Sequence, residues 1–243
     1  MSKVWQQLLF PRGCPVCGRP VLGLLCPACS RREPEWRMSR FRLAVGDYNF
    51  LYVSGAASLF AYRGEAAEAV RRMKYSGEAW RAAGFAHLMA ARIFGCNYKA
   101  GYGILLPCGA MPVGLEFSAV VPVPPGRPGV HIPGQLAKTL SRDLQIPVQN
   151  ALYKSRPTPR QEELDREGRK KNLWGSFSLR RGQNVEGKNI LLVDDVITTG
   201  TTVSACAYAL LQAGAESVFA VSIAAAELEK APQEPEKEKP ETL

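Results

Sequence analysis

Three short apolar runs in the chain predict buried strands. They are rich in Val, Ile and Leu, hold few polar residues, and span Ala119–Val123, Ile190–Val193 and Ser217–Ile223. A strand with one wet face alternates polar and apolar residues, whereas a parallel strand covered on both faces is apolar nearly throughout. The pattern therefore favours a parallel sheet with helices on its faces.

Longer segments with apolar residues at helical spacing predict helices. These segments are Glu65–Met73, Glu78–Phe94, Gly134–Leu144 and Thr201–Gly214. In the last of them Val203, Ala207 and Leu210 fall at helical spacing, and Gly214 is a natural stop. Strand, helix and strand across residues 190–223 predict a βαβ unit.

Composition divides the chain into three predicted parts. Residues 1–42 contain clustered cysteines and many basic residues, and residues 43–228 contain the predicted strands and helices. Residues 229–243 are rich in Pro and charge, so burial cannot offset their ordering entropy and we expect a disordered tail. The predicted fold is α/β, an open, mostly parallel sheet with flanking helices, preceded by a small zinc-ribbon-like module.

Charge and hydrophobicity narrow the functional classes. With 46% hydrophobic residues in 243, the chain is neither disordered throughout nor fibrous. Its formal net charge of +9 favours phosphate-bearing partners, either small phosphorylated molecules or nucleic acid. The sequence lacks an apolar run of about 20 residues and a signal-peptide core, so we expect no membrane span and a cytoplasmic location.

Four cysteines form two C-x-x-C pairs, and they predict a zinc site. The pairs are Cys14–Cys17 and Cys26–Cys29, with eight residues between them. Two such turns supply the tetrahedral thiolate set that Zn²⁺ prefers, while redox-active or incidental cysteines are the alternative. Because protein would fill all four positions, the metal would be structural, in a module too small to fold without it.

Arginines crowd the same N-terminal region. They could contact nucleic acid, or they could form a solvated basic face, and the sequence does not favour either interpretation. They are Arg12, Arg19, Arg31, Arg32, Arg37, Arg40 and Arg42.

An acid pair followed by a Thr- and Gly-rich loop is the most informative motif. The strand at 190–193 runs into Asp194 and Asp195, and a short loop then opens the helix at Thr201. Ligands of open α/β sheets bind at this edge, where loop amides and a helix N-terminus can hold a phosphate. The carboxylates suit ribose hydroxyls, and Gly200 allows a close backbone approach. Hydroxyl donors come from Thr198, Thr199, Thr201 and Thr202.

Other interpretations of this loop are weaker. Gly-Lys-Ser/Thr at Walker spacing and G-x-G-x-x-G are both missing from the loop. An acid pair beside ordinary threonine N-caps would explain a lone Thr-Gly-Thr, but not the whole string of strand, acids, loop and helix.

The string from Val193 to Gly200 resembles the 5-phosphoribosyl-1-diphosphate (PRPP) signature of type I phosphoribosyltransferases. Together with the four-cysteine module, the chain resembles the ComF family of competence-associated, phosphoribosyltransferase-like proteins from Cys14 to about Ala226. The resemblance implies a type I phosphoribosyltransferase-like fold and Mg²⁺ bound with PRPP. It implies that Asp194 and Asp195 are the catalytic residues, which hold the ribose hydroxyls. It also implies that residues Thr198–Thr202 bind the 5-phosphate.

Further segments carry the resemblance. Val121–Pro124 is similar to the family's diphosphate loop, which puts Pro124 beside the ligand. Met73–Gly77 is similar to its Leu-Lys-Tyr-x-Gly segment, which implies ligand contacts for Lys74 and Tyr75. The alternative for these two is a helix end with Lys favourable to the dipole and Tyr packed. Segments 156–161 and 169–177 resemble the connecting hood.

One loop departs from the family pattern. After the Pro-Val-Pro strand, ComF proteins usually carry several arginines and then Arg-Gly-Phe-Asn-Gln. Residues 125–135 here read Pro-Gly-Arg-Pro-Gly-Val-His-Ile-Pro-Gly-Gln, where only Arg127 and Gln135 correspond. This chain therefore has fewer arginines in the loop that would lie near a diphosphate.

The resemblance implies an Mg²⁺-dependent transferase, a glycosyltransferase of the pentosyl class, linked to competence and DNA uptake. Phosphoribosyl transfer needs positioning and electrostatics rather than a protein nucleophile, which suits a chain whose two histidines, His87 and His131, we interpret as structural. The alternative is a non-catalytic single-stranded-DNA-binding or adaptor protein with a degenerate nucleotide pocket. In either case DNA-uptake proteins are candidate partners.

Overall fold

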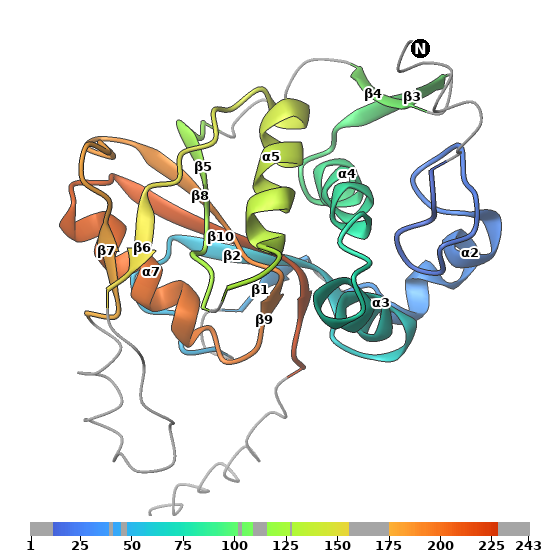
Figure 1. Ribbon diagram of the computed structural model, residues 1–243, viewed down its shortest axis with the longest axis horizontal. Helices are drawn as coiled ribbons and strands as arrows, with labels where there is room; N and C mark the ends of the chain where they lie inside the picture. Colours follow the sequence, from blue (N-terminus) through green and yellow to red (C-terminus); the bar gives the residue numbers. More distant parts are fainter. Residues whose placement is uncertain are drawn as a thin grey trace, which may run out of the picture.

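A computed structural model describes residues 12–38, 41–44, 48–101, 104–108, 116–126, 128–155 and 175–227. Its centre is a six-stranded sheet in the order β1-β2-β10-β8-β5, in which β9 also pairs with β10 (Figure 1). Pairs β2–β10, β10–β8, β8–β5 and β10–β9 are parallel, and β1 is antiparallel to β2. The strands are β1 (Arg42–Leu43), β2 (Gly55–Ala61), β5 (Ala119–Pro122), β8 (Asn189–Val193), β9 (Val196–Ile197) and β10 (Ser217–Ala225).

Helices cover both faces of this sheet. Ile190 and Leu192 of β8 share a core with α7, while Leu191 and Val193 share the other core with α4 and α5. Side chains of a strand alternate between faces, so these four β8 residues are buried on one side or the other, which explains the continuous apolar run. The helices are α3 (Gly64–Tyr75), α4 (Arg81–Ile93), α5 (Ile132–Leu144) and α7 (Thr201–Gln212).

The predicted fold class is confirmed. Each helix and strand expected from the apolar pattern is present, with ends displaced by no more than three residues, and β8, α7 and β10 form the expected βαβ unit. The largest shift is at α4, which begins at Arg81 rather than Glu78.

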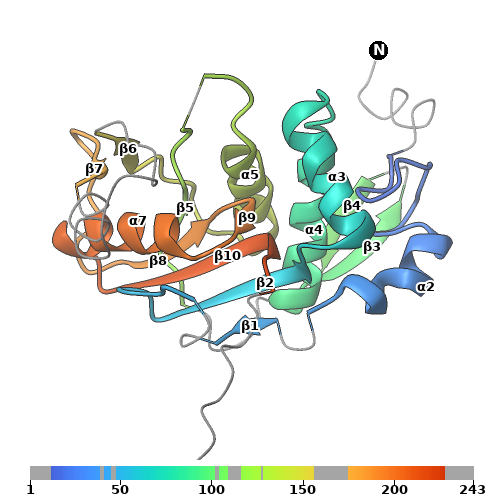
Figure 2. The same cartoon turned by 90° about the horizontal axis from the view of Figure 1, so that it is seen from below.

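Several elements are not evident from the sequence pattern. Strand β2 is buried along its whole length, but its Gly-Ala-Ala-Ser start lacks the Val and Ile typical of a strand. A β3–β4 hairpin lies beside α4, away from the main sheet (Figure 2), and fills part of the stretch before β5. The other elements are α2 (Pro27–Trp36), β3 (Asn97–Gly101), β4 (Ile104–Cys108), β6 (Leu152–Lys154) and β7 (Phe177–Leu179).

The cysteine-bearing segment packs directly on the α/β body. Trp36 of α2 meets Phe60 of β2 edge to face, with ring centroids 5.9 Å apart. The carboxylate of Glu33, buried on α2, accepts two hydrogen bonds of 2.9 Å from Arg92 of α4. A buried carboxylate is tolerated when it is paired in this way, so α2 is fixed to α4 by a specific ionic contact and to β2 by aromatic packing.

Two predicted segments lie outside the described residues. They are the tail at 229–243 and most of the hood, residues 156–174. Among the helices that the structure describes, none combines the length and the apolar character that crossing a membrane requires.

Candidate functional site

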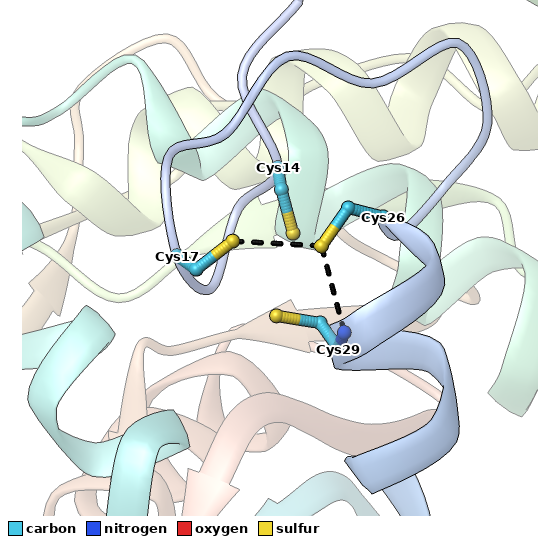
Figure 3. Close-up of side chains that lie close together, drawn as sticks. All are labelled: Cys14, Cys17, Cys26 and Cys29. Carbon is cyan, nitrogen blue, oxygen red and sulfur yellow. Dashed lines mark hydrogen bonds between the residues drawn. The ribbon is translucent and has the colours of Figure 1, made fainter.

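The four cysteines of the N-terminal segment converge on one point (Figure 3). Their sulfur atoms all lie within 4.8 Å of one another, although Cys14 and Cys17 come from a loop and Cys29 lies on α2. The loop is closed by hydrogen bonds from the Cys14 amide to the Arg19 carbonyl and from the Gly18 amide to the Cys14 carbonyl. Gly18 has a φ of +82°, a conformation that glycine adopts without strain.

This donor set fits a tetrahedral metal. Four sulfurs at about 2.3 Å from Zn²⁺ would lie about 3.8 Å from each other, close to the observed cluster. Cys14, Cys26 and Cys29 are buried, so the cluster is shielded from solvent. The residues present could therefore hold Zn²⁺ with four thiolates and with every coordination position filled by protein.

Arg19 stabilises the thiolate form of Cys17. Its Nε atom donates to the Cys17 sulfur over 3.4 Å. Burial raises the pKa of Cys17, but the Arg19 amide and guanidinium outweigh it and lower that pKa to about 6. Burial raises the pKa of Cys14 and of Cys29, so Cys17 loses its proton most readily of these three thiols, and metal binding would have to displace the protons of the other two.

The acid pair lies where the sheet opens at the carboxyl ends of its strands. Asp194 and Asp195 follow β8 directly and precede β9. The Asp194 amide donates to the Val221 carbonyl of β10, so the backbone of the pair is held by the sheet. Each carboxylate also accepts from the next amide: Asp194 from Asp195 over 2.8 Å and Asp195 from Val196 over 2.7 Å.

Lys74 reaches this pair from α3. Its Nζ lies 2.7 Å from Oδ1 of Asp195, and both side chains are largely buried. Burial alone would lower the pKa of Lys74, but the charge of Asp195 outweighs it and leaves that pKa above its ordinary value. Burial and the neighbouring Asp195 carboxylate raise the pKa of Asp194 to about 7, and Lys74 opposes this shift only in part. Lys74 therefore neutralises the Asp194–Asp195 pair only in part, which favours binding of a further cation there.

The Thr- and Gly-rich loop leads directly into the N-terminus of α7. Thr198 and Thr199 are exposed, and the Thr199 and Thr201 hydroxyls lie 2.6 Å apart. Gly200, the N-cap, has a φ of +79° and offers no side-chain hydrogen bond to the first amides of the helix. The first turn of a helix has N–H groups without intrahelical partners, so this end can accept an anion.

Residues 49 and 50, which the sequence pattern did not single out, contact the Thr- and Gly-rich loop. The Asn49 amide donates to the Thr199 carbonyl, and the Ser204 hydroxyl of α7 donates to the Asn49 carbonyl over 2.6 Å. The ring of Phe50 lies so close to Gly200 that an added Cβ would be 2.7 Å from it. Non-periodic residues that act only through tertiary contacts leave no signal in the sequence pattern.

The other residues singled out from the sequence differ in their burial and in their contacts. Pro124 is buried just beyond β5, and the preceding Val123 amide donates to the Val193 carbonyl, which brings this loop beside the acid pair. His131 donates from Nε2 to the Val123 carbonyl over 2.7 Å and so fixes the start of α5. Tyr75 is 80% exposed at the end of α3. Arg127 lies outside the described residues.

This edge of the sheet thus combines two features that favour binding of an anion with one that favours binding of a cation. The loop and helix N-terminus suit a phosphate, and Lys74 adds a positive charge. The acid pair suits hydroxyl groups or a hydrated divalent cation, which oxygen ligands prefer. A sugar phosphate that binds with a divalent cation satisfies all of these groups together.

Comparisons with known proteins identify a family and several relatives. Residues 115–242 match the family model described as the phosphoribosyl transferase domain. DNA utilization protein YhgH of Escherichia coli strain K12 is 28% identical over 213 residues, which cover 84% of this chain and 80% of that protein. Competence protein F of Haemophilus influenzae is 26% identical over 200 residues, covering 79% and 75%.

A solved structure also aligns with part of the chain. It is glutamine PRPP amidotransferase from B. subtilis complexed with ADP and GMP, at 28% identity and a TM-score of 0.34. The alignment covers 44% of this chain and 22% of that one, so the chain spans less than a quarter of that enzyme.

Proposed function

Because this chain belongs to the phosphoribosyl transferase domain family, we propose that it binds PRPP together with Mg²⁺ at the carboxyl end of β8. We propose further that it transfers the phosphoribosyl group to an acceptor. The observation that supports this best is the acid pair at the strand end, followed at once by the Thr- and Gly-rich loop and the N-terminus of α7. PRPP carries a 5-phosphate and ribose hydroxyls in one molecule, so one ligand could contact both the loop and the acid pair.

In this proposal each group has one role. The loop amides of 198–202 and the threonine hydroxyls hold the 5-phosphate, helped by the dipole of α7. Asp194 and Asp195 accept hydrogen bonds from the ribose hydroxyls. Lys74 offsets the negative charge that accumulates when a diphosphate-bearing ligand meets two carboxylates. Pro124 lines the loop that faces the diphosphate.

The reaction would replace one bond at C1 of the ribose by another. The bond from C1 to the diphosphate oxygen breaks as the acceptor forms its own bond to C1, and diphosphate leaves. Mg²⁺ would bind together with PRPP beside Asp194 and Asp195, and would offset the charge of the leaving group. The residues of this chain position the sugar and exclude water, which is the main protein contribution to such transfers.

The cysteine cluster has a separate, structural role in this proposal. Cys14, Cys17, Cys26 and Cys29 hold Zn²⁺ and stabilise the segment that packs on α3 and α4. Since the thiolates fill the coordination sphere, this metal takes no part in the transfer.

Calorimetry with Mg²⁺ and PRPP tests the ligand directly. We expect wild-type protein to bind and the double variant Asp194→Asn/Asp195→Asn to lose binding. The matched control is Glu186→Gln/Glu216→Gln, which makes the same charge change at exposed residues near the opposite ends of β8 and β10. Equal binding by all three proteins, or none by folded wild type, would contradict the proposal.

The names of the relatives motivate a second proposal, that the chain acts in DNA uptake or use. Exposed arginines of the cysteine segment and of β1, such as Arg31, Arg37 and Arg42, could contact phosphates of single-stranded DNA. Affinity for a labelled oligonucleotide should then fall steeply with salt. An affinity independent of salt would contradict this proposal, and DNA binding without PRPP binding would favour a non-catalytic adaptor.

A further inference from the structure

The guanidinium of Arg81 is buried at the point where the cysteine loop meets the α/β body. Arg81 is the first residue of α4 and is 3% exposed. A buried guanidinium is stable only when its donors are satisfied, so its partners show what it was placed to hold. One side of the group pairs with Glu78, whose carboxylate lies 2.5 Å from Nε.

The other side of the guanidinium points at the cysteine loop. A single nitrogen, Nη1, donates to the carbonyls of Pro15 over 2.9 Å and Val16 over 3.0 Å, with the Cys14 carbonyl at 3.4 Å. These three carbonyls belong to the turn that carries Cys14 and Cys17. Arg81 therefore gathers the backbone of the turn from outside the segment that supplies the sulfurs.

Tight packing keeps the turn in this position. The Trp80 indole stacks under the guanidinium, 4.7 Å from ring centroid to Cζ. A Cβ on Gly13 would lie 2.6 Å from the same indole, and a Cβ on Gly84 would lie 3.0 Å from Pro15. The loop and the start of α4 thus meet with no room for a side chain at either glycine.

We propose that Arg81 is a positioning residue of the metal site, although it is not a ligand. Its hydrogen bonds fix the turn so that the Cys14 and Cys17 sulfurs face Cys26 and Cys29. Because the Glu78 carboxylate pairs with the guanidinium, Arg81 acts on the metal site through its hydrogen bonds to the turn rather than through net charge. Partners of this kind typically change metal affinity by about 10- to 100-fold.

The inference rests on the proposed zinc site, and its test separates the two. Metal-free full-length protein is titrated with Co²⁺, whose visible absorption reports tetrahedral thiolate ligation, and Zn²⁺ affinity is measured by competition with a chromogenic chelator. We expect Arg81→Gln to keep the four-thiolate spectrum but to bind Zn²⁺ about 10- to 100-fold more weakly. Arg81→Lys keeps the charge without the planar fork, so we expect an intermediate loss.

The matched control is Arg92→Gln, on the same helix. It removes the guanidinium that holds Glu33 of α2, but it does not touch the carbonyls of the cysteine turn. We expect near wild-type Zn²⁺ affinity in this variant even if its stability falls.

Wild-type affinity in Arg81→Gln, or an equal loss in Arg92→Gln, would overturn the positioning role. If wild type binds neither metal, the zinc proposal fails as well. Should Arg81→Gln not fold, undiminished affinity in Arg81→Lys would overturn the inference.

Discussion

The Nζ atom of Lys74, in the last turn of α3, lies 2.7 Å from Oδ1 of Asp195, which follows β8. The contact joins two motifs that are far apart in the sequence into one charged site. It also ties the α3–α4 half of the chain to the half that matches the family model.

The first prediction concerns this ion pair. Lys74→Met should weaken binding of PRPP and Mg²⁺ by about tenfold or more, because two carboxylates would then face a polyanionic ligand without the lysine charge; tenfold corresponds to about 1.4 kcal/mol. Calorimetry measures the effect. Lys74→Arg keeps the charge and serves as the control, and unchanged affinity in Lys74→Met would exclude a role for Lys74 in the ligand site.

The second prediction concerns pH and Asp194. Its pKa of about 7 in the folded protein lies above the ordinary carboxyl value of 3.8. Between these values the folded state retains a proton that the unfolded state has lost, so this group makes the free energy of unfolding fall as pH rises. The stabilising contribution is complete below the unfolded pKa and is lost as pH passes through the folded pKa.

Asp194→Asn should remove that pH dependence. We expect the variant to be more stable than wild type at about pH 8 and closer to it at about pH 4.5, in urea unfolding at both values. The same variant should lose PRPP binding, because an amide does not replace the carboxylate. A wild-type pH profile in the variant would show that Asp194 is not the group that titrates.

The third prediction concerns Gly200. Alanine there must adopt a φ of +79° and place its Cβ 2.7 Å from the Phe50 ring. We expect Gly200→Ala to cost about 1–3 kcal/mol of folding free energy and to weaken phosphate binding as the loop shifts. The control is Gly126→Ala, since no atom of the residues that the structure describes lies within 4 Å of an added Cβ at that position. Chemical denaturation of both variants checks the difference.

The fourth prediction concerns metal removal. The buried cysteines share one apolar core with Phe60, Phe85 and the helices α3 to α5. Chelation of the metal should therefore lower the thermal midpoint of the whole protein, in one transition rather than two. Tryptophan fluorescence and far-UV circular dichroism should report the same midpoint. An unchanged midpoint after verified metal removal would argue against a structural metal, and Cys29→Ser should resemble chelated wild type.

The sequence pattern was sufficient for the parts of the fold that depend on local regularity. Strands β5, β8 and β10 are apolar along most of their length because both faces are covered, and the Asp194–Asp195 pair stands out because it follows such a strand. The resemblance to the ComF family is confirmed by the match to Competence protein F, by the phosphoribosyl transferase domain and by the four converging cysteines.

Other features depend on contacts that no local pattern reports. Strand β2 begins with small residues, and small residues do not distinguish a strand from a loop. The support of the Gly200 loop by Asn49 and Phe50 is purely tertiary. Arg81 reads as an ordinary helix residue until its carbonyl partners are known.

The position of β2 has a practical consequence for recombinant work. The region matched by the family model begins at residue 115, yet β10 within it pairs along its length with β2, which ends at Ala61. A clone trimmed to the match would expose the edge of β10 and discard Lys74. Starting instead at Leu43 would leave Arg81 and Arg92 without the groups that they hold. Clones should therefore keep the cysteine segment and β2 together with the region matched by the family model.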